Sequence, residues 1–403
     1  MSDISASHDP GKNNYENMSS FRSQLCPLLF LATIFFLNFI SRVIPGPLMP
    51  AIENDMGVSH SEAGSLFLFI SLGYFVTLIG SGFVSSRITH RGTIILSAIS
   101  TGLSLLCISF CDSLSEIHLG MLALGMAAGF YLPSGIATLT TLINFRHWGK
   151  AIAIHELAPN LSFVAAPLLA EAILCGFSWR AVPAFLGVFS LVAGLAFSFF
   201  GKGGENSGAP PSFRFFKILL SEPSFWIMTT LFGLAIGGSL GIYNMLPLYL
   251  VSERGVDRNY ANTLIALSRV SGLGMAFFAG WATDRLGTKF TIKCVFLLTG
   301  LTTMLMGIVP DSWILIIVFL QPVMAVCFFP AGFAALSSMG PSTTRNLSVS
   351  LTIPLAFLLG GGVIPAGVGM MGDSGYFSQG IALTGGLILI GFGLSFYLEF
   401  SDK

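Results

Sequence analysis

The sequence is short of charge. Only 9% of its 403 residues are Asp, Glu, Lys or Arg, against roughly 25% in soluble domains. This deficit excludes an ordinary water-soluble fold and indicates that most of the chain lies in a lipid bilayer. The 19 basic and 19 acidic residues cancel, so we expect no basic surface for nucleic acid.

Motifs for metal, redox and nucleotide chemistry are also lacking. The six cysteines form no CxxC pair and lie in or beside apolar runs, so we interpret them as ordinary helix residues. His155-Glu156 begins like a zinc-protease HExxH motif, but Pro159 stands where the second His is required. No GxxxxGK[ST] loop for ATP occurs. We therefore expect no enzyme, no metal site, no cofactor and no ATP-driven pump.

What the sequence does contain is long apolar runs, each near the 20 residues that a membrane helix needs. They lie at 25–52, 62–86, 92–110, 117–142, 150–176 and 181–200, and again at 224–251, 260–283, 290–309, 312–338, 346–370 and 376–398. We predict an all-α membrane protein with twelve transmembrane helices in two pseudo-symmetric six-helix bundles. Its parts would be a disordered tail (1–22), a first bundle (23–200), a Gly-, Pro- and Ser-rich linker (201–223) and a second bundle (224–403).

Two internal matches support the division into halves. Gly82-x-x-x-Ser86-Arg87 is followed 198 positions later by Gly280-x-x-x-Asp284-Arg285. Pro and Gly of the run FYLPSG in span 4 recur 197 positions later in FFPAG of span 10. Repeated halves are typical of secondary transporters, although chance turn signals remain an alternative.

Basic residues predict the orientation. With a cytoplasmic N-terminus, fourteen of the 19 Lys and Arg fall in the termini or in loops on the cytoplasmic side. Arg180, Arg254 and Arg258 fall outside, and two remain in the membrane. We expect cytoplasmic termini, a monomer, and the plasma membrane as location (the cell inner membrane if the source is bacterial).

The segment GWATDRLGTKF (280–290) resembles the loop signature GxxxDRxGxK of the major facilitator superfamily, and the length and layout of nearly the whole chain agree with it. The resemblance implies alternating access between two halves and a gating role for this loop. Its residues here are Gly280, Asp284, Arg285, Gly287 and Lys289, with Arg87 in the first half. The first half departs from the pattern, with Ser86 and Thr89 in place of the acidic residue and the second glycine.

Two arginines lie near the membrane midplane. Arg42 in span 1 and Arg269 in span 8 are each about 15 Å from the membrane surface at 1.5 Å per residue. An Arg at that depth costs at least about 2.5–3.5 kcal/mol, so neither should face lipid. Because guanidinium forks suit carboxylates and phosphates, the pair predicts an anion site, with Asn38 one turn from Arg42. Neutralisation by buried carboxylates or backbone carbonyls is the alternative.

Other polar residues of the spans are candidate substrate contacts. The resemblance places spans 1, 4, 7 and 10 around a central cavity, and span 2 carries a mildly polar stripe. The candidates are Tyr74, Tyr131, Tyr243, Asn244 and Gln321. Hydrogen bonding between helices is the alternative role for each.

Span 5 carries three titratable residues, His155, Glu156 and Glu171. A carboxyl group inside a membrane helix predicts proton coupling, with Glu156 the leading carrier and His155 beside it. A permanent counter-ion or a helix-start group is the alternative for Glu156.

These features predict a secondary transporter for a small organic anion, a carboxylate or an organophosphate, with protons as the coupling ion. The drug-exporter branch resembles this chain less, since Met121 stands where those exporters have an Arg in span 4. An exporter of apolar or drug-like compounds, and a receptor or channel that does not transport, remain the alternatives.

Overall fold

The computed structural model describes residues 21–210, 219–338 and 345–398, and these are helical with no strand among them. The predicted tail lies outside the described residues except for Phe21 and Arg22, which begin α1. The first half consists of α1 (Phe21–Val43), α2 (Pro45–Met56), α3 (His60–Ser109), α4 (Leu114–Gly129), α5 (Tyr131–Leu142), α6 (Trp148–Leu174) and α7 (Ala181–Phe200).

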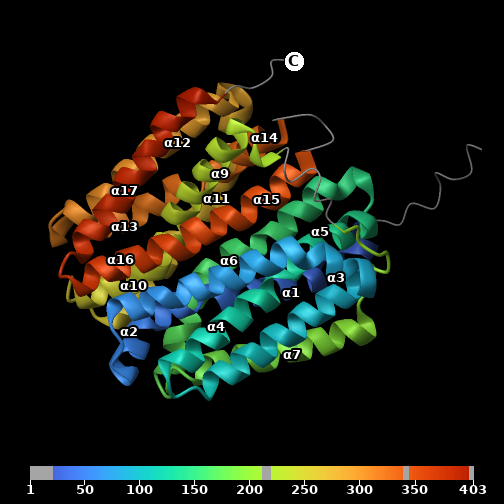
Figure 1. Ribbon diagram of the computed structural model, residues 1–403, viewed down its shortest axis with the longest axis horizontal. Coiled ribbons are helices and arrows are strands. Elements are labelled where there is room, and N and C mark those ends of the chain that lie inside the picture. Colours follow the sequence, from blue (N-terminus) through green and yellow to red (C-terminus); the bar gives the residue numbers. More distant parts are fainter. Residues whose placement is uncertain (1–20, 211–218, 339–344, 399–403) are drawn as a thin grey trace, which may run out of the picture.

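The second half repeats this arrangement beside the first (Figure 1). It consists of α9 (Pro223–Ile236), the π-helical segment η2 (Gly237–Gly241), α10 (Ile242–Ser252), α11 (Arg258–Leu286), α12 (Thr288–Ile308), α13 (Asp311–Ala325), α14 (Phe328–Ser338), α15 (Arg345–Phe357), the π-helical segment η3 (Leu358–Val363), α16 (Ile364–Asp373) and α17 (Phe377–Leu394).

The described residues make twelve passes. Ten helical stretches are long and apolar enough to cross a membrane. The 50-residue α3 is one of the ten but holds two passes, because its backbone reverses at Thr89. The 29-residue α11 supplies the remaining pass. The predicted all-α fold of twelve transmembrane helices is confirmed.

The internal repeat is visible in the backbone. Thr89 has φ 68° and ψ 167°, and Gly287, 198 positions later, has φ 85° and ψ 148°. Each sits at the sharp turn that follows the second pass of its half. Positive φ with extended ψ is a region that glycine adopts freely and that a β-branched residue adopts only with backbone strain. In the first half, threonine thus replaces the second glycine of the motif, and the backbone keeps the conformation that favours glycine.

Spans 7 and 11 are interrupted at glycines and touch there. A Cβ on Gly360 would lie 2.3 Å from the carbonyl oxygen of Gly233, and one on Gly241 would lie 2.5 Å from that of Gly360. Such distances permit only glycine, so these glycines serve close helix packing. The π-helical turns that result leave backbone carbonyls free for other partners.

The two ends of the molecule differ in how the halves meet. We call the end that carries Phe21, Gly201 and Leu398 the linker end, and the opposite one the far end. At the linker end, residues 201–210 lie against the first half. The Arg91 amide there donates to the Gly204 carbonyl at 2.6 Å. At the far end the halves are joined directly. Asp373 of α16 accepts hydrogen bonds from the Ser59 hydroxyl (2.8 Å) and the His60 amide (2.7 Å) at the start of α3.

Candidate functional site

Arg42 lies at the interface of the two halves. It ends α1 just before the junction with α2, and its side chain is buried, with 7% exposed. Its guanidinium carbon lies 4.3 Å from the ring centre of Tyr74 and 5.6 Å from that of Phe357, the latter in the second half. Within the described part of the chain no carboxylate forms an ion pair with it, and its Nε atom is buried without a hydrogen-bond partner. Aromatic faces offset part of the desolvation of this cation but leave its Nε donor unused.

Arg269 approaches the same interface from α11. One terminal nitrogen donates to the Ser239 carbonyl of η2 at 2.9 Å. The guanidinium carbon lies 4.9 Å from the ring centres of both Phe163 and Tyr243. The Ser239 carbonyl thus offsets part of the charge of Arg269, as expected if backbone carbonyls neutralise this arginine. Among the described residues no acidic partner is present to balance the charge.

Residues of span 7 lie beside both arginines. Ser239 and Tyr243, four residues apart, face Arg269, whereas Leu240 and Asn244, also four apart, line the cavity of Arg42. Consecutive helix positions point about 100° apart, so the arginines contact adjacent faces of one segment. Both cations therefore lie at the place where η2 interrupts the helix.

Gln321 supports this segment from span 10. Its amide nitrogen donates to the Gly238 carbonyl of η2 at 2.7 Å and to the Thr303 hydroxyl at 3.0 Å. Together with Arg269 it satisfies the carbonyls that the π-helical turn leaves free. The structure thus gives Gln321 a partner in the backbone beside the site, and not a place in the wall of the Arg42 cavity.

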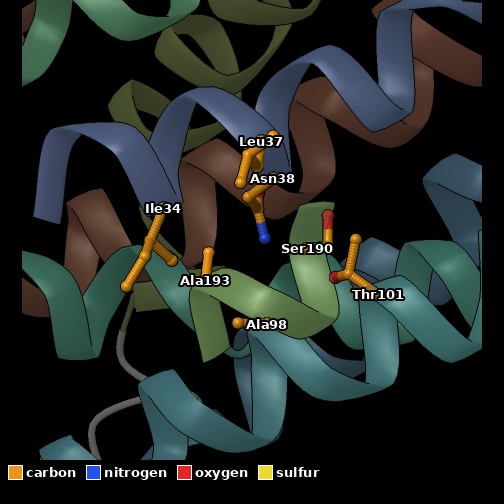
Figure 2. A pocket seen from close by; sticks show the side chains of 7 residues that line it. All are labelled: Ile34, Leu37, Asn38, Ala98, Thr101, Ser190 and Ala193. Carbon is orange, nitrogen blue, oxygen red and sulfur yellow. The ribbon is translucent and has the colours of Figure 1, made fainter. Parts of the chain in front are cut away.

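Asn38 points away from Arg42. Its amide donates to the Ser97 hydroxyl (3.3 Å) and the Ala128 carbonyl (3.2 Å), inside the first half. Figure 2 shows it in a small internal pocket between α1, α3 and α7. The two side chains start from one helix face, but the short amide is held by its neighbours while the long arginine extends to Tyr74. The shared face predicted from the spacing does not bring them to a shared site.

Tyr131 and His155 form a buried chain of hydrogen bonds that ends at Glu156. The Tyr131 hydroxyl donates to the Leu31 carbonyl at 2.8 Å and lies 3.1 Å from His155 Nε2. His155 Nδ1 lies 3.4 Å from a carboxylate oxygen of Glu156. The histidine is fully buried, whereas half of the Glu156 side chain is exposed. Tyr131 therefore belongs to the proposed proton site and not to the Arg42 cavity.

Glu171 joins the two halves. Only 8% of its side chain is exposed, and its carboxylate accepts from Arg258 Nε (3.0 Å) and NH2 (3.2 Å) and from the Asn262 amide (2.6 Å). Asn262 also donates to the Pro47 carbonyl at 3.2 Å. We call Glu171, Arg258 and Asn262 the far-end latch. The sequence placed Glu171 among candidate proton carriers; the structure gives it a basic partner from the other half.

The residues predicted to act in gating lie at the linker end. Asp284, Arg285 and Arg87 are exposed, and within the described residues Asp284 and Arg285 have no ion-pair partner. Lys289 donates to the Leu398 carbonyl at 2.6 Å. Gly287 supplies the turn described above, and Gly280 has open space around its Cα. Among the described residues, Asp284 and Arg285 thus lack ion-pair partners in a structure whose halves are joined at the far end.

Sequence reasoning missed the aromatic residues around the arginines. Phe39, Phe163 and Phe357 read as ordinary lipid- or core-facing positions in a chain with 37 phenylalanines, yet each ring centre lies within 6 Å of a guanidinium carbon. Nothing in the spacing distinguishes them, since the partners come from other spans.

Comparison with known proteins identifies the family of this chain. Residues 31–365 match the Major Facilitator Superfamily. The TsgA protein homologue of Buchnera aphidicola is 25% identical over 66% of this chain and 67% of its own length. The probable sulfoacetate transporter SauU of Cupriavidus necator is 22% identical, covering 70% and 71%. The membrane sensor protein UhpC of Escherichia coli is 23% identical, covering 74% and 72%.

Solved structures agree on the fold. A bacterial homologue of the human lysosomal transporter Spinster superposes with a TM-score of 0.82 at 15% identity, covering 94% of this chain and 98% of that one. The nucleoside transporter NupG gives 0.74 at 14% identity, covering 92% and 99%. With its matching profile and its twelve passes, the chain belongs to the major facilitator superfamily and is a multi-pass membrane transporter rather than an enzyme.

Proposed function

We propose that this transporter carries a small organic anion, a carboxylate or an organophosphate, by alternating access between its two halves. The observation that carries the proposal is the pair Arg42 and Arg269. Both are cations at the meeting point of the halves, on adjacent faces of span 7, without an acidic partner among the described residues. A buried charge is stable only when paired, and an anionic substrate supplies the missing charge.

The donors and acceptors around His155 support proton coupling. The one hydrogen of the Tyr131 hydroxyl is used by Leu31, so His155 Nε2 must donate to the Tyr131 oxygen. In a neutral ring this leaves a lone pair on Nδ1, facing a carboxylate oxygen of Glu156 at 3.4 Å. Two acceptors attract each other only when a proton lies between them. His155 and Glu156 together therefore form a site for one proton, next to the half-exposed side chain through which it enters.

Arg269 connects the proton site with the substrate site. It packs on Phe163, two helical turns from Glu156 on the same α6. Substrate binding that neutralises Arg269 would change the electrostatic cost of holding the proton, which is the linkage that coupled transport requires. Glu171 is already paired with Arg258, so we assign the coupling role to Glu156 with His155.

The distribution of basic residues and the exposed loop residues support the proposed orientation, location and gating role. The excess of Lys and Arg at the linker end supports a cytoplasmic location for both termini, and the relatives in bacteria support the inner membrane. With this orientation the structure is closed on the outside by the far-end latch. Asp284 and Arg285 then act in the opposite state, where closure of the linker end brings partners to them. We expect the protein to act as a monomer.

A binding screen on the purified protein tests the proposal. We expect thermal stabilisation by carboxylates or organophosphates, because a ligand of the folded state raises its stability. Counterflow of the stabilising anion into liposomes should follow. Stabilisation by cationic or apolar compounds alone would support the exporter instead. Binding without counterflow would indicate a receptor, a role that the name of the sensor UhpC carries.

A further inference from the structure

The Arg42 cavity holds a second unpaired polar group. Asn244 of α10 lines the cavity with Arg42, and only 2% of it is exposed. Its Oδ1 atom is buried without a hydrogen-bond partner, as is Arg42 Nε. Native proteins pair nearly all buried polar groups, so two orphans in one cavity, a donor on Arg42 and an acceptor on Asn244, point to a missing partner.

Asn244 is held where it stands. The backbone of α2 packs on it so closely that a Cβ on Gly46 would lie 3.2 Å from Asn244 Cα. Its backbone cannot move away from the cavity without separating α2 from α10. The Asn244 side chain therefore starts from a fixed position in the wall shared with Arg42.

We propose that the cavity selects an anion that carries a hydroxyl group beside its charged group, with Asn244 as the residue that recognises the hydroxyl. This inference rests on the proposed function. The oxygens of a carboxylate or of a fully ionised phosphate accept from Arg42 but cannot donate to the Asn244 oxygen. A hydroxyl both donates and accepts, so it pairs with the amide in either of the two orientations that an Asn side chain can adopt.

The rest of the cavity limits the size of such an anion. In this structure the cavity is small, about 20 Å³ in volume, which is room for about one water molecule. Its other walls combine the apolar side chains of Phe67, Ile70, Leu240 and Phe357 with the hydroxyl-bearing side chains of Ser71 and Tyr74. They offer apolar contacts to a short carbon chain and no second charged group. A small hydroxy acid or a small hydroxylated organophosphate, entering as the halves separate, matches this set of one cation, one amide, two hydroxyls and apolar walls.

Matched pairs of ligands that differ by one hydroxyl test the inference. We would measure the affinity of glycolate against acetate, and of glycerol 3-phosphate against propyl phosphate, by calorimetry on the purified transporter. A site built to bind a hydroxyl rejects the analogue without it, and we expect a preference on the order of tenfold or more for the hydroxylated member of at least one pair. Because this measurement uses the unaltered chain, it does not depend on how a variant folds.

The variant Asn244→Leu, similar in size, then assigns the preference to its residue. We expect the hydroxylated ligand to fall to the affinity of its plain analogue, while the plain analogue binds as before. Asn38→Leu, the same substitution at a residue that points away from Arg42, serves as the control and should keep the preference. Equal affinities within both pairs in the unaltered chain would overturn this inference and leave the proposed function standing. A preference that survives in Asn244→Leu would overturn the role of Asn244. Failure of all four anions to bind would count against the proposed function itself.

Discussion

Loss of the far-end latch should open the far end of the transporter. In Arg258→Gln, Glu171 keeps only the Asn262 amide in a site where 8% of its side chain is exposed. When the halves separate, the carboxylate meets water and needs no partner. The variant therefore raises the free energy of the closed state and leaves that of the open state nearly unchanged.

The size of the effect follows from the contacts that are lost. Two hydrogen bonds to a charged group are removed, each worth about 1.5–3 kcal/mol when buried. Because 36% of the Arg258 side chain is exposed, solvent screening reduces the total, and we take about 2 kcal/mol. That value shifts the ratio of open to closed molecules by roughly 30-fold. A closed state populated to about 99% would fall to about three quarters.

Distances between spin labels at Ser115 and Ser312 measure this ratio. These exposed residues begin α4 and α13 at the far end, one in each half, and the six native cysteines would be replaced by alanine. Arg254→Gln is the matched control, because Arg254 pairs with Asp311 inside the second half at 2.8 Å. A distance distribution that is the same in Arg258→Gln as in the parent, or an equal shift in Arg254→Gln, would refute the reasoning.

Three other predictions concern the turn, the loop and the proton site. Thr89→Gly should raise the free energy of unfolding by about 1–2 kcal/mol in thermal unfolding, because it removes backbone strain of about 1–3 kcal/mol and glycine is nearly as good a helix cap as threonine. Gly287→Ala should lower the free energy of unfolding. A Thr89→Gly variant less stable than the parent would show that no strain is stored at this turn. Asp284→Asn should slow turnover in liposomes and leave equilibrium affinity within a few-fold, and the reverse pattern would contradict a gating role. Glu156→Gln should abolish uphill uptake driven by a pH gradient yet spare counterflow, which needs no net proton movement, and persistence of both would remove Glu156 as the carrier.

The sequence predicted the helices well because lipid leaves the backbone few choices. An apolar run that crosses a bilayer must satisfy its own amides and carbonyls, so it becomes a helix. The turn at Thr89 was not predicted, because Thr89 appeared in the repeat only as a departure from the glycine found at position 287. The formation of the helices, by contrast, depends on physics that is local to one span.

Features that depend on partners from distant spans could not be read in this way. Asn38 and Arg42 share a helix face, but which neighbour each side chain meets depends on its length and on the helices beyond it. Glu171 and Arg258 are 87 positions apart and meet because the two halves close at the far end. The arginines themselves were predictable, because the cost of a charge at the midplane holds for any fold.

Uptake of the stabilising anion by Arg42 variants tests the central claim most directly. Arg42→Lys keeps the charge and loses the planar fork that matches carboxylate and phosphate, and Arg42→Ala loses both. We predict that uptake into liposomes falls sharply in Arg42→Lys and to background in Arg42→Ala. Both variants should still fold, as shown by an unchanged elution volume and a cooperative thermal transition. Normal uptake by a folded Arg42→Ala would contradict the account, because the anion would then need no cation at this position.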